Sequence, residues 1–381
     1  MVEKIDIPLC MPYFDEEEQN LVKEVLDSGW LAHGPKTEEF EKEFAKYTGV
    51  KKAVSLNSCT SALQLAILAN NLKGEIILPS FTFVASANSI VNSGCRPVFS
   101  EVDYNSCNIL PEGIRKKITK NTVAIMPVHY AGQPCNMKEI MEIAEENNLI
   151  VIEDSAECIG GTFNNKKTGS FGIGCFSFYP TKNMTTGEGG MVTTNDLNIA
   201  DKIKALRAHG IISSAFDREK KKRPWLRIAS FEGYNYRLCD ILSAIGIVQL
   251  RKLDKMNNLR RKNAEFLNKS LNFNEIKTPE ESKGCKNVYQ MYTVKVENID
   301  RTKFISHLRE KGIGASVHFD PPVHLQDCYL KMGYKKGSFP ITEKLSESIV
   351  TLPMYPQLTK EQLVFMVASI EEAIKKCRNL R

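Results

Sequence analysis

Residues 53–102 read AVSLNSCTSALQLAILANNLKGEIILPSFTFVASANSIVNSGCRPVFSEV, a stretch in which short apolar runs alternate with segments of helical period. The predicted strands are 53–56, 76–79 and 98–102, and the predicted helices are 60–70 and 84–92. Strands that alternate with helices of about ten residues are typical of βαβ crossovers. The stretch therefore predicts an α/β fold with a mainly parallel sheet and helices on both faces.

The same alternation extends along the chain in both directions. Further helices are expected at 15–28, 37–48, 111–118, 137–146 and 196–209, and further strands at 123–128 and 149–153. Two more strands, at 175–179 and 190–194, are joined by a Gly- and Thr-rich loop that leaves no room for a crossover helix. At least one of them is therefore expected to run antiparallel at the sheet edge.

The C-terminal part of the chain has a different texture. Residues 241–268 predict one long or broken helix, and we place the domain boundary within it. Beyond it, strand-like segments at 288–294 and 314–319 alternate with helices at 301–311 and 359–376, a pattern typical of a small α+β domain. The expected division is an N-terminal segment (1–14) packing on the small domain, a large domain (15–255) and a small C-terminal domain (256–381).

Composition and charge exclude several classes of protein. Of 381 residues, 42% are hydrophobic and 25% charged, and 51 Lys+Arg against 45 Asp+Glu leave a net charge of +6. This excess is mild, and the one dense basic cluster, 218–223 (REKKKR), is expected to be a solvated loop, so no nucleic-acid partner is predicted. The apolar runs are shorter than the roughly 20 residues of a membrane helix, and residues 1–10 are too charged for a signal peptide. No membrane association is predicted, and a cytoplasmic location is expected.

The cysteines predict neither disulfides nor a metal site. There are eleven, an odd number, and they are scattered without a C-x-x-C pair. This spacing argues against a disulfide framework and against a zinc site. They are expected to be reduced thiols that pack in the interior.

Three short segments carry the residues suited to chemistry. Lys182 follows a predicted strand among small polar residues and glycines, where a desolvated amine can act as a nucleophile. Asp154 ends the apolar strand 149–153, and ligands of open α/β sheets bind beyond the carboxyl ends of strands. Ser58, Cys59 and Thr60 lead from a strand into a helix, whose first amides and hydroxyls suit a phosphate. Taken singly, each has a plainer interpretation: a surface lysine, a helix N-cap and ordinary capping.

Together the three segments supply what pyridoxal phosphate requires. The cofactor needs an amine for covalent attachment, an acid that pairs with its pyridinium nitrogen, and an anion site for its phosphate. A doubly wound α/β chain that contains all three is therefore predicted to bind this cofactor.

The chain also resembles the DegT/DnrJ/EryC1/StrS aminotransferases, nucleotide-sugar enzymes of fold-type I among the pyridoxal phosphate enzymes. The resemblance spans nearly the whole chain and rests on an ordered set of motifs. They are Ser28-Gly-Trp30 with Gly34-Pro35, Pro79-Ser-Phe-Thr-Phe83, Pro127-Val-His129-Tyr-Ala-Gly-Gln133, Glu153-Asp154, Thr181-Lys182-Asn183 with Gly187-Glu-Gly-Gly190, Gly233-Tyr-Asn235-Tyr-Arg237, and His318-Phe-Asp-Pro-Pro-Val-His324.

The resemblance implies a role for each matching residue. Lys182 falls on the lysine that attaches the cofactor, and Asp154 on the carboxylate that keeps the pyridine nitrogen protonated. Phe83 matches the aromatic ring stacked on the cofactor, and Asn235 matches an amide that reaches the phosphate from the neighbouring subunit, which implies a homodimer with shared active sites. The remaining cofactor-binding residues implied are Cys59, Thr60, Glu157 and Ser177, and the substrate-binding residues are Trp30, Tyr179, Asn183, His318 and His324. For the two histidines, a structural role in a Pro-rich turn is an open alternative.

Two departures from the family pattern bear on function. Cys59 stands where the family commonly has Gly, which adds a thiol close to the cofactor. Glu157 stands where many members have Gln or His, and a Glu there is similar to enzymes of the perosamine-synthase type, which aminate a GDP-linked 4-keto-6-deoxy sugar, and to some UDP-sugar members.

The resemblance thus implies an aminotransferase that carries an amino group from L-glutamate to the keto carbon of a nucleotide-linked 4-keto-6-deoxy sugar, with GDP favoured and pyridoxamine phosphate formed in between. UDP- and dTDP-linked sugars are the alternatives, and cyclitol and aminohydroxybenzoate relatives share the cofactor residues. A pyridoxamine-dependent sugar dehydratase would carry His in place of Lys182, and a non-catalytic regulator would be expected to lose Lys182 or Asp154.

Overall fold

The computed structural model describes residues 6–211 and 225–377. Its central sheet has the strand order β1-β9-β8-β5-β4-β2-β3. These strands are β1 (Lys52–Leu56), β2 (Glu75–Pro79), β3 (Arg96–Ser100), β4 (Thr122–Ile125), β5 (Ile150–Asp154), β8 (Ile173–Ser177) and β9 (Gly190–Thr194). Neighbours from β3 to β8 pair in parallel, whereas β9 is antiparallel to both β8 and β1. The mainly parallel sheet with an antiparallel strand near one edge is therefore confirmed.

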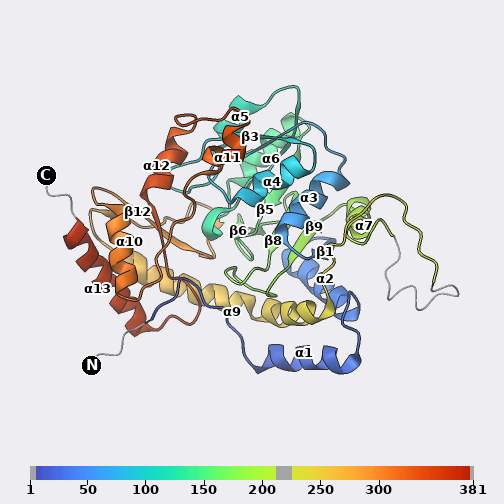
Figure 1. The fold of residues 1–381 in the computed structure, drawn as a ribbon, viewed down its shortest axis with the longest axis horizontal. Coiled ribbons are helices and arrows are strands. Elements are labelled where there is room, and N and C mark those ends of the chain that lie inside the picture. The colour runs from blue at the N-terminus through green and yellow to red at the C-terminus, as the bar shows by residue number, and fades with distance from the viewer. Residues whose placement is uncertain (1–5, 212–224, 378–381) are drawn as a thin grey trace.

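Helices cover both faces of this sheet, as predicted (Figure 1). The helices that follow strands of this sheet are α3 (Cys59–Ala69), α4 (Val84–Asn92), α5 (Pro111–Lys117), α6 (Met137–Glu146) and α7 (Leu197–Leu206). Side chains alternate along each strand, so that Ile76 packs toward α3 while Ile77 packs toward α6. A strand that is buried on both faces needs an apolar run, and residues 53–102 contain such runs.

Near β8 and β9 the sheet is covered by three helices that do not connect neighbouring parallel strands. Helix α2 (Pro35–Thr48) inserts Phe44 against Phe176 of β8, with ring centroids 5.0 Å apart. Helices α1 (Glu16–Ser28) and α2 both pack on α9, which runs unbroken over Asp240–Ser270. Asp15 caps α1, and its partner Glu18 completes a capping box, which explains why the helix begins there.

The long helix α9 belongs to two cores. Its first half packs Ile247 and Leu253 with the α2 phenylalanines, and its second half packs Ala264 and Leu267 into a separate C-terminal cluster. Figure 1 shows α9 running from the region of α2 to the region of α10 (Arg301–Glu310). We propose that the chain divides into domains 15–255 and 256–381 within this helix.

The C-terminal part combines a small sheet with helices. Its sheet, in the order β10-β12-β13, is antiparallel. Its elements are β10 (Ile276–Lys277), β12 (Tyr292–Val296), α10 (Arg301–Glu310), η2 (Val323–Leu325), α11 (Asp327–Leu330), α12 (Pro340–Ser348), β13 (Ile349–Leu352) and α13 (Lys360–Cys377). This α+β character agrees with the prediction.

Three details of the predicted elements were wrong. Residues 314–319 form no strand, because only Ser316 makes a single bridge, to Thr351 of β13. The strand expected at 288–294 begins at Tyr292 instead. A small sheet of β6 (Thr162–Phe163), β7 (Lys166–Lys167) and β11 (Cys285–Lys286) was not expected, since two-residue strands carry no period.

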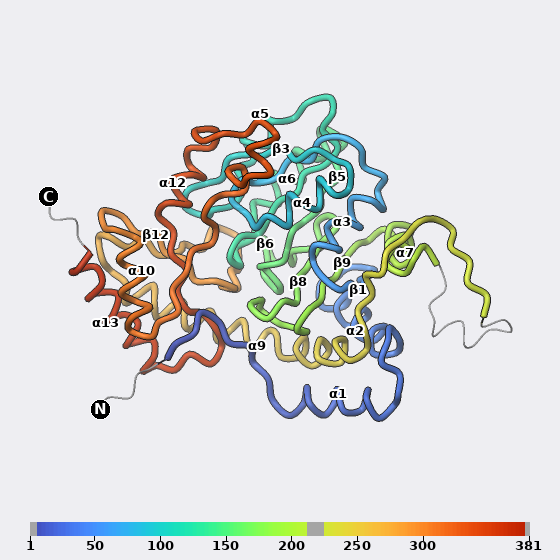
Figure 2. Tube along the Cα trace, in the orientation of Figure 1, coloured from blue at the N-terminus to red at the C-terminus, as the bar shows by residue number. Residues whose placement is uncertain are grey.

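The N-terminal segment lies against the C-terminal part of the chain. Ile7 forms a parallel bridge with Ile313, through hydrogen bonds of 2.9 Å to Gly312 and 2.8 Å from Gly314. The N-terminal segment and α13 lie on the same side of the molecule (Figure 2). The basic cluster 218–223 lies outside the described residues. All eleven cysteines are free thiols, and no described helix is long and apolar enough to span a bilayer.

Candidate active site

A cavity of about 560 Å³ opens beyond the carboxyl ends of β5 and β8. Its wall comes from both parts of the chain and from the N-terminal segment. The lining includes Cys59, Thr60, Phe83, Asp154, Glu157, Ser177, Tyr179, Lys182 and His318. Nine residues that sequence reasoning placed in the site are thus brought together, although they are spread over 260 positions of the chain, from 59 to 318.

Asp154 is a buried carboxylate at the end of β5. Oδ2 accepts a hydrogen bond from Ser86 Oγ at 2.7 Å, and Oδ1 accepts one from the Ala156 amide at 3.2 Å. Burial raises the pKa of Asp154 above its usual value, although these two hydrogen bonds oppose the shift. Among the described residues no basic side chain forms an ion pair with it, so the carboxylate lacks a counter-ion.

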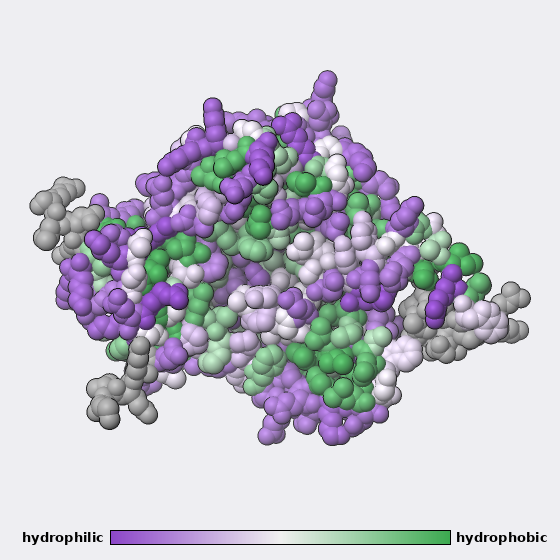
Figure 3. All heavy atoms as spheres, in the orientation of Figure 1, coloured by the Kyte–Doolittle hydropathy of each residue, from purple (hydrophilic) through white to green (hydrophobic). Residues whose placement is uncertain are grey.

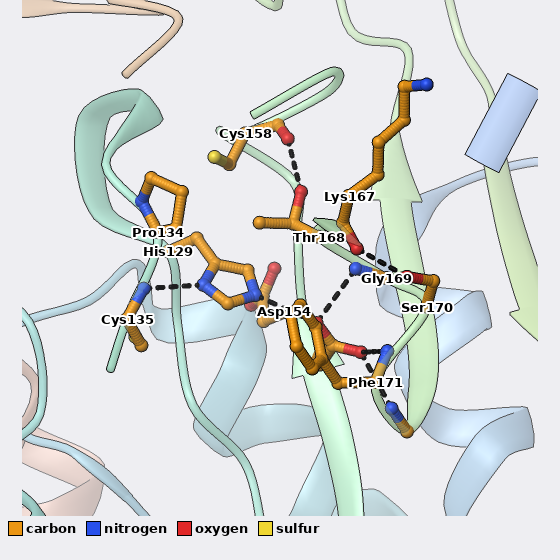
Figure 4. A network of polar contacts seen from close by, with 12 residues as sticks. His129, Pro134, Cys135, Asp154, Cys158, Lys167, Thr168, Gly169, Ser170 and Phe171 are labelled. Carbon is orange, nitrogen blue, oxygen red and sulfur yellow. Dashed lines mark hydrogen bonds and ion pairs between the residues drawn. The ribbon is translucent and has the colours of Figure 1, made fainter. Parts of the chain in front are cut away.

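Glu153, the residue before Asp154, points to the other side of the strand and holds the structure behind the site. Its carboxylate accepts hydrogen bonds of 2.8 Å from the amides of Gly169, Phe171 and Gly172. His129 contacts the same carboxylate through Nε2 at 3.2 Å, while its Nδ1 accepts from the Cys135 amide. Figure 4 shows His129, Gly169 and Phe171 around this network. The paired acids of the sequence therefore divide into a support and a site residue.

Lys182 lies on the loop between β8 and β9 with its amine directed into the cavity. Its side chain is 15% exposed, and Nζ lies 3.4 Å from Glu157 Oε1. The other carboxylate oxygen of Glu157, Oε2, accepts a hydrogen bond of 3.0 Å from the Ala131 amide. Ala131 has a φ of 53°, an uncommon value for a residue with a side chain, and such values collect at functional sites.

The start of α3 forms an anion cradle on the wall of the cavity. Ser58 caps the helix and accepts the Ser61 amide at 3.1 Å, and the first intrahelical bond runs from Ala62 to Ser58. This leaves the amides of Cys59 and Thr60 for an anion. A Cβ on Gly190 would lie 2.3 Å from the Ser58 carbonyl, so only glycine allows β9 to approach the cradle so closely.

Cys59 lies within this cradle as a neutral thiol. It is 9% exposed, and burial raises the pKa of its thiol well above the usual value, with the nearby Asp154 carboxylate acting in the same direction. The departure from the family pattern therefore adds a small packing group to the cradle and no reactive thiolate.

Aromatic and imidazole groups line the mouth of the cavity. Phe83 and Tyr179 are 58% and 48% exposed although they line the cavity, so their rings offer open faces to a ligand. His318 Nδ1 lies 2.9 Å from Thr351 Oγ1, and burial lowers the pKa of this imidazole. Near neutral pH the ring is therefore uncharged and can exchange hydrogen bonds with a polar ligand.

Four of the predicted residues do not line the cavity of this chain. Asn183 is buried and donates to Asn257 at 2.7 Å and to Val288, so its role here is to hold the Lys182 loop on α9. His324 is fully buried between Ser80 and Glu343, which supports the structural alternative for this histidine. Trp30 donates from its indole to the His33 carbonyl. Asn235 is exposed on the segment after Gly233.

Several residues that line the cavity were not predicted from the sequence. They are Leu9, Cys10, Ser86, Gln290, Thr351 and Met354. Ser86 carries the only weak signal, because it lies in the first turn of a helix that begins beyond a strand end. The others come from segments that only the packing of the C-terminal part brings to the cavity.

These residues fit pyridoxal phosphate. The Asp154 carboxylate, which forms no ion pair among the described residues, suits a pyridinium nitrogen, the α3 cradle suits a phosphate, and Lys182 presents an amine in the same cavity. No cluster of three or more candidate metal ligands occurs in residues 6–211 and 225–377.

The chain is similar to known proteins over nearly its whole length. It is 42% identical to the uncharacterized protein MJ1066 of Methanocaldococcus jannaschii, covering 99% of this chain and all of that one. It is 36% identical to the spore coat polysaccharide biosynthesis protein SpsC of Bacillus subtilis, covering 98% and 99%. Among solved structures, Helicobacter pylori PseC, an aminotransferase of pseudoaminic acid biosynthesis, superposes with a TM-score of 0.90 at 28% identity, covering 98% and 100%.

A further structure bears on the cofactor. The putative sugar aminotransferase Spr1654 of Streptococcus pneumoniae, solved in PLP and PMP forms, superposes with TM-scores of 0.91 and 0.92 at 25% identity, covering 98% and 97% of this chain. The model of the DegT/DnrJ/EryC1/StrS aminotransferases matches residues 12–371. With this match and the geometry of the cavity, the fold-type I expectation is confirmed, and the chain belongs to the DegT/DnrJ/EryC1/StrS family of pyridoxal phosphate-dependent sugar aminotransferases.

Proposed function

We propose that the protein transfers an amino group from L-glutamate to the keto carbon of a nucleotide-linked 4-keto-6-deoxy sugar, with a GDP-linked sugar favoured. The observation that carries the transfer is the convergence of Lys182, the unpaired Asp154 carboxylate and the α3 cradle in one cavity. The sugar class is supported by Glu157 at the third position after Asp154, as in perosamine-type enzymes. UDP- and dTDP-linked sugars are the alternatives.

Bound pyridoxal phosphate supplies an electron sink and carries the amino group between the two substrates. The residues of the chain supply binding and proton transfer. Asp154 pairs with the pyridinium nitrogen and keeps it protonated, a role that its burial and lack of another counter-ion favour. The Cys59 and Thr60 amides and the Ser177 hydroxyl bind the phosphate.

Lys182 has two tasks in this proposal. Nζ would attach the cofactor in the resting enzyme. As a free amine, Lys182 would accept a proton from the substrate carbon and give one to the cofactor carbon, so that the proton is conserved. Phe83 stacks on the cofactor ring, while Tyr179 and His318 contact the sugar nucleotide at the mouth of the cavity.

We further propose that the active enzyme is a homodimer in which Asn235 of one subunit binds the phosphate held by the other. Asn235 is exposed and does not line the cavity of its own chain. Apolar side chains gather on the face near α1 (Figure 3), and Leu26 and Leu31 there are 53% and 44% exposed. Such a face suits a second copy of the chain.

Absorbance spectroscopy tests the proposal. The protein with pyridoxal phosphate should show a cofactor band that excess L-glutamate bleaches and that one member of a panel of GDP-, UDP- and dTDP-linked 4-keto-6-deoxy sugars restores. The Lys182→Ala variant should still bind the cofactor but should not turn over. If glutamate leaves the band of the wild-type protein unchanged, or if the variant turns over, the proposal is wrong.

A further inference from the structure

We propose that Glu157 is a positioning residue that acts as the counter-ion of Lys182: its carboxylate fixes the place of Nζ and stabilises the protonated amine. This inference rests on the proposed function, since it concerns the lysine that moves the proton. It goes further, because it assigns a charge-dependent role to the residue by which this chain departs from family members with Gln or His.

The geometry of Glu157 is that of a held counter-ion. Its Oε2 is occupied by the Ala131 amide at 3.0 Å, which leaves Oε1 directed at Lys182 Nζ, 3.4 Å away. Glu157 is 6% exposed and the Lys182 side chain 15% exposed, so water screens the pair only weakly. The positive φ of Ala131 aims its amide at the carboxylate, so both ends of the contact are set by the fold.

The other charged groups around Glu157 make Lys182 its main partner. The titratable groups that interact with its charge are Lys182, Asp154, Cys59, His318, Tyr130 and Cys158. Burial keeps the two thiols and the Tyr130 phenol neutral, and it lowers the pKa of His318. Within the described residues, Lys182 is therefore the one cation in ion-pair contact with Glu157.

A counter-ion at this place has a chemical consequence. When the free Lys182 amine takes a proton from the substrate carbon, the carboxylate 3.4 Å away stabilises the ammonium that forms. The proton stays on Nζ, and Glu157 does not accept it. A glutamine at this position would keep the bond to Ala131 but would not stabilise the charge.

The cofactor-free protein allows a direct test. The rate at which an amine-acylating reagent modifies Lys182, followed at pH 7.5 by peptide mass spectrometry, reports the fraction of unprotonated amine. Removing an opposite charge at this distance is expected to raise that rate about tenfold or more in Glu157→Gln. Glu157→Asp keeps the negative charge but moves it away from Nζ, so it should give a smaller increase. Glu188→Gln is the matched control.

Glu188 lines the same cavity but is exposed and makes no ion pair with Lys182 among the described residues, so its variant should change the rate less than about twofold. An unchanged rate in Glu157→Gln, or equal increases in Glu157→Gln and Glu188→Gln, would overturn the inference. Because the labelling uses no cofactor, its result is independent of whether glutamate bleaches the bound cofactor, which is the test of the proposed function.

Discussion

Asp154 suits its proposed role but destabilises the native state of the cofactor-free protein. Its carboxylate is buried at the end of β5 with two hydrogen bonds and no ion pair among the described residues. Burial raises its pKa, so the native state without cofactor holds the proton more tightly than the unfolded chain does. At a pH above the native-state pKa, the ionised Asp154 carboxylate destabilises the native state. This loss of stability disappears in acid, where Asp154 is protonated in both the native and the unfolded state.

Replacing Asp154 with Asn should therefore stabilise the cofactor-free protein at pH 7.5 and leave its stability nearly unchanged at pH 4. A rise in melting temperature of about 1–3 °C at the higher pH is expected for a gain of roughly 1 kcal/mol. Thermal unfolding at the two pH values measures this, and Asp27→Asn on the exposed face of α1 serves as the control. The same variant should lose most of its activity, and a destabilised Asp154→Asn protein at pH 7.5 would contradict this reasoning.

At the scale of elements, the contact between α2 and α9 depends on one glycine. A Cβ added to Gly246 would lie 2.7 Å from Cζ of Phe40, which is fully buried against Phe178. Glycine in a helix normally costs about 1 kcal/mol relative to alanine, so its presence in the middle of α9 points to close packing.

Gly246→Ala should therefore destabilise the protein by about 1 kcal/mol, because overpacking of about 1–3 kcal/mol exceeds the gain in helix propensity. Phe40→Leu removes the clash, so the double variant should be more stable than the sum of the two single changes implies. Denaturant unfolding of all four proteins gives this coupling energy. Simple additivity of the two changes would show that the ring does not limit the approach of the helices.

A second link between elements is a buried polar cluster of His33, Glu41 and Arg207. Arg207 donates to Glu41 Oε1 at 2.5 Å and to the Ser55 carbonyl, and its other nitrogen donates to His33 Nε2 at 3.3 Å. His33 is therefore held as the neutral ring, and burial, aided by the Arg207 charge, lowers its pKa to about 4. The cluster connects the entry to α2 with the end of α7.

Because the pKa of His33 is lower in the native state than in the unfolded chain, stability should fall as the pH drops from 6.5 toward 4. Between pH 7 and pH 5 this residue accounts for a loss of about 2 kcal/mol. Urea unfolding of wild type and His33→Gln at both values tests it, since the variant should lose less stability over this interval. His209→Asn, at an exposed histidine, should follow the wild type, and an equal loss in His33→Gln would exclude His33 as the source.

For the whole molecule, the proposed dimer predicts complementation between two inactive variants. Lys182→Ala removes the amine, and Asn235→Asp places a negative charge near the phosphate of the neighbouring site. A mixed dimer contains one site with both native residues, so refolding an equal mixture should recover about a quarter of wild-type activity, as two-fold symmetry requires. No recovery, in a mixture shown to exchange subunits, would place Asn235 in its own subunit's site or outside any site.

Much of this architecture could be predicted because its signals are local. Strands β2, β4 and β5 contain short apolar runs, and a helix such as α6, which Asn136 caps, carries an apolar period of its own. Asp154 could be singled out because it ends such a run, and Lys182 because it lies in the polar, Gly-rich loop after β8, at the edge of the sheet where parallel strands end together. The strand predicted at 314–319 was wrong for the same reason. The alternation of residues there resembles a strand, but strand pairing needs a partner that no local pattern reveals.

The sequence by itself determined the order of strands and helices, the amine, the acid and the anion cradle, since periodicity, capping and strand ends are properties of neighbouring residues. Only the tertiary structure decided which other side chains join them. His324 and Asn183 are enclosed by contacts with distant residues, whereas Ser86, Ala131 and Thr351 reach Asp154, Glu157 and His318 across long stretches of chain. Such contacts are set by how the layers pack, which no single segment of the sequence encodes.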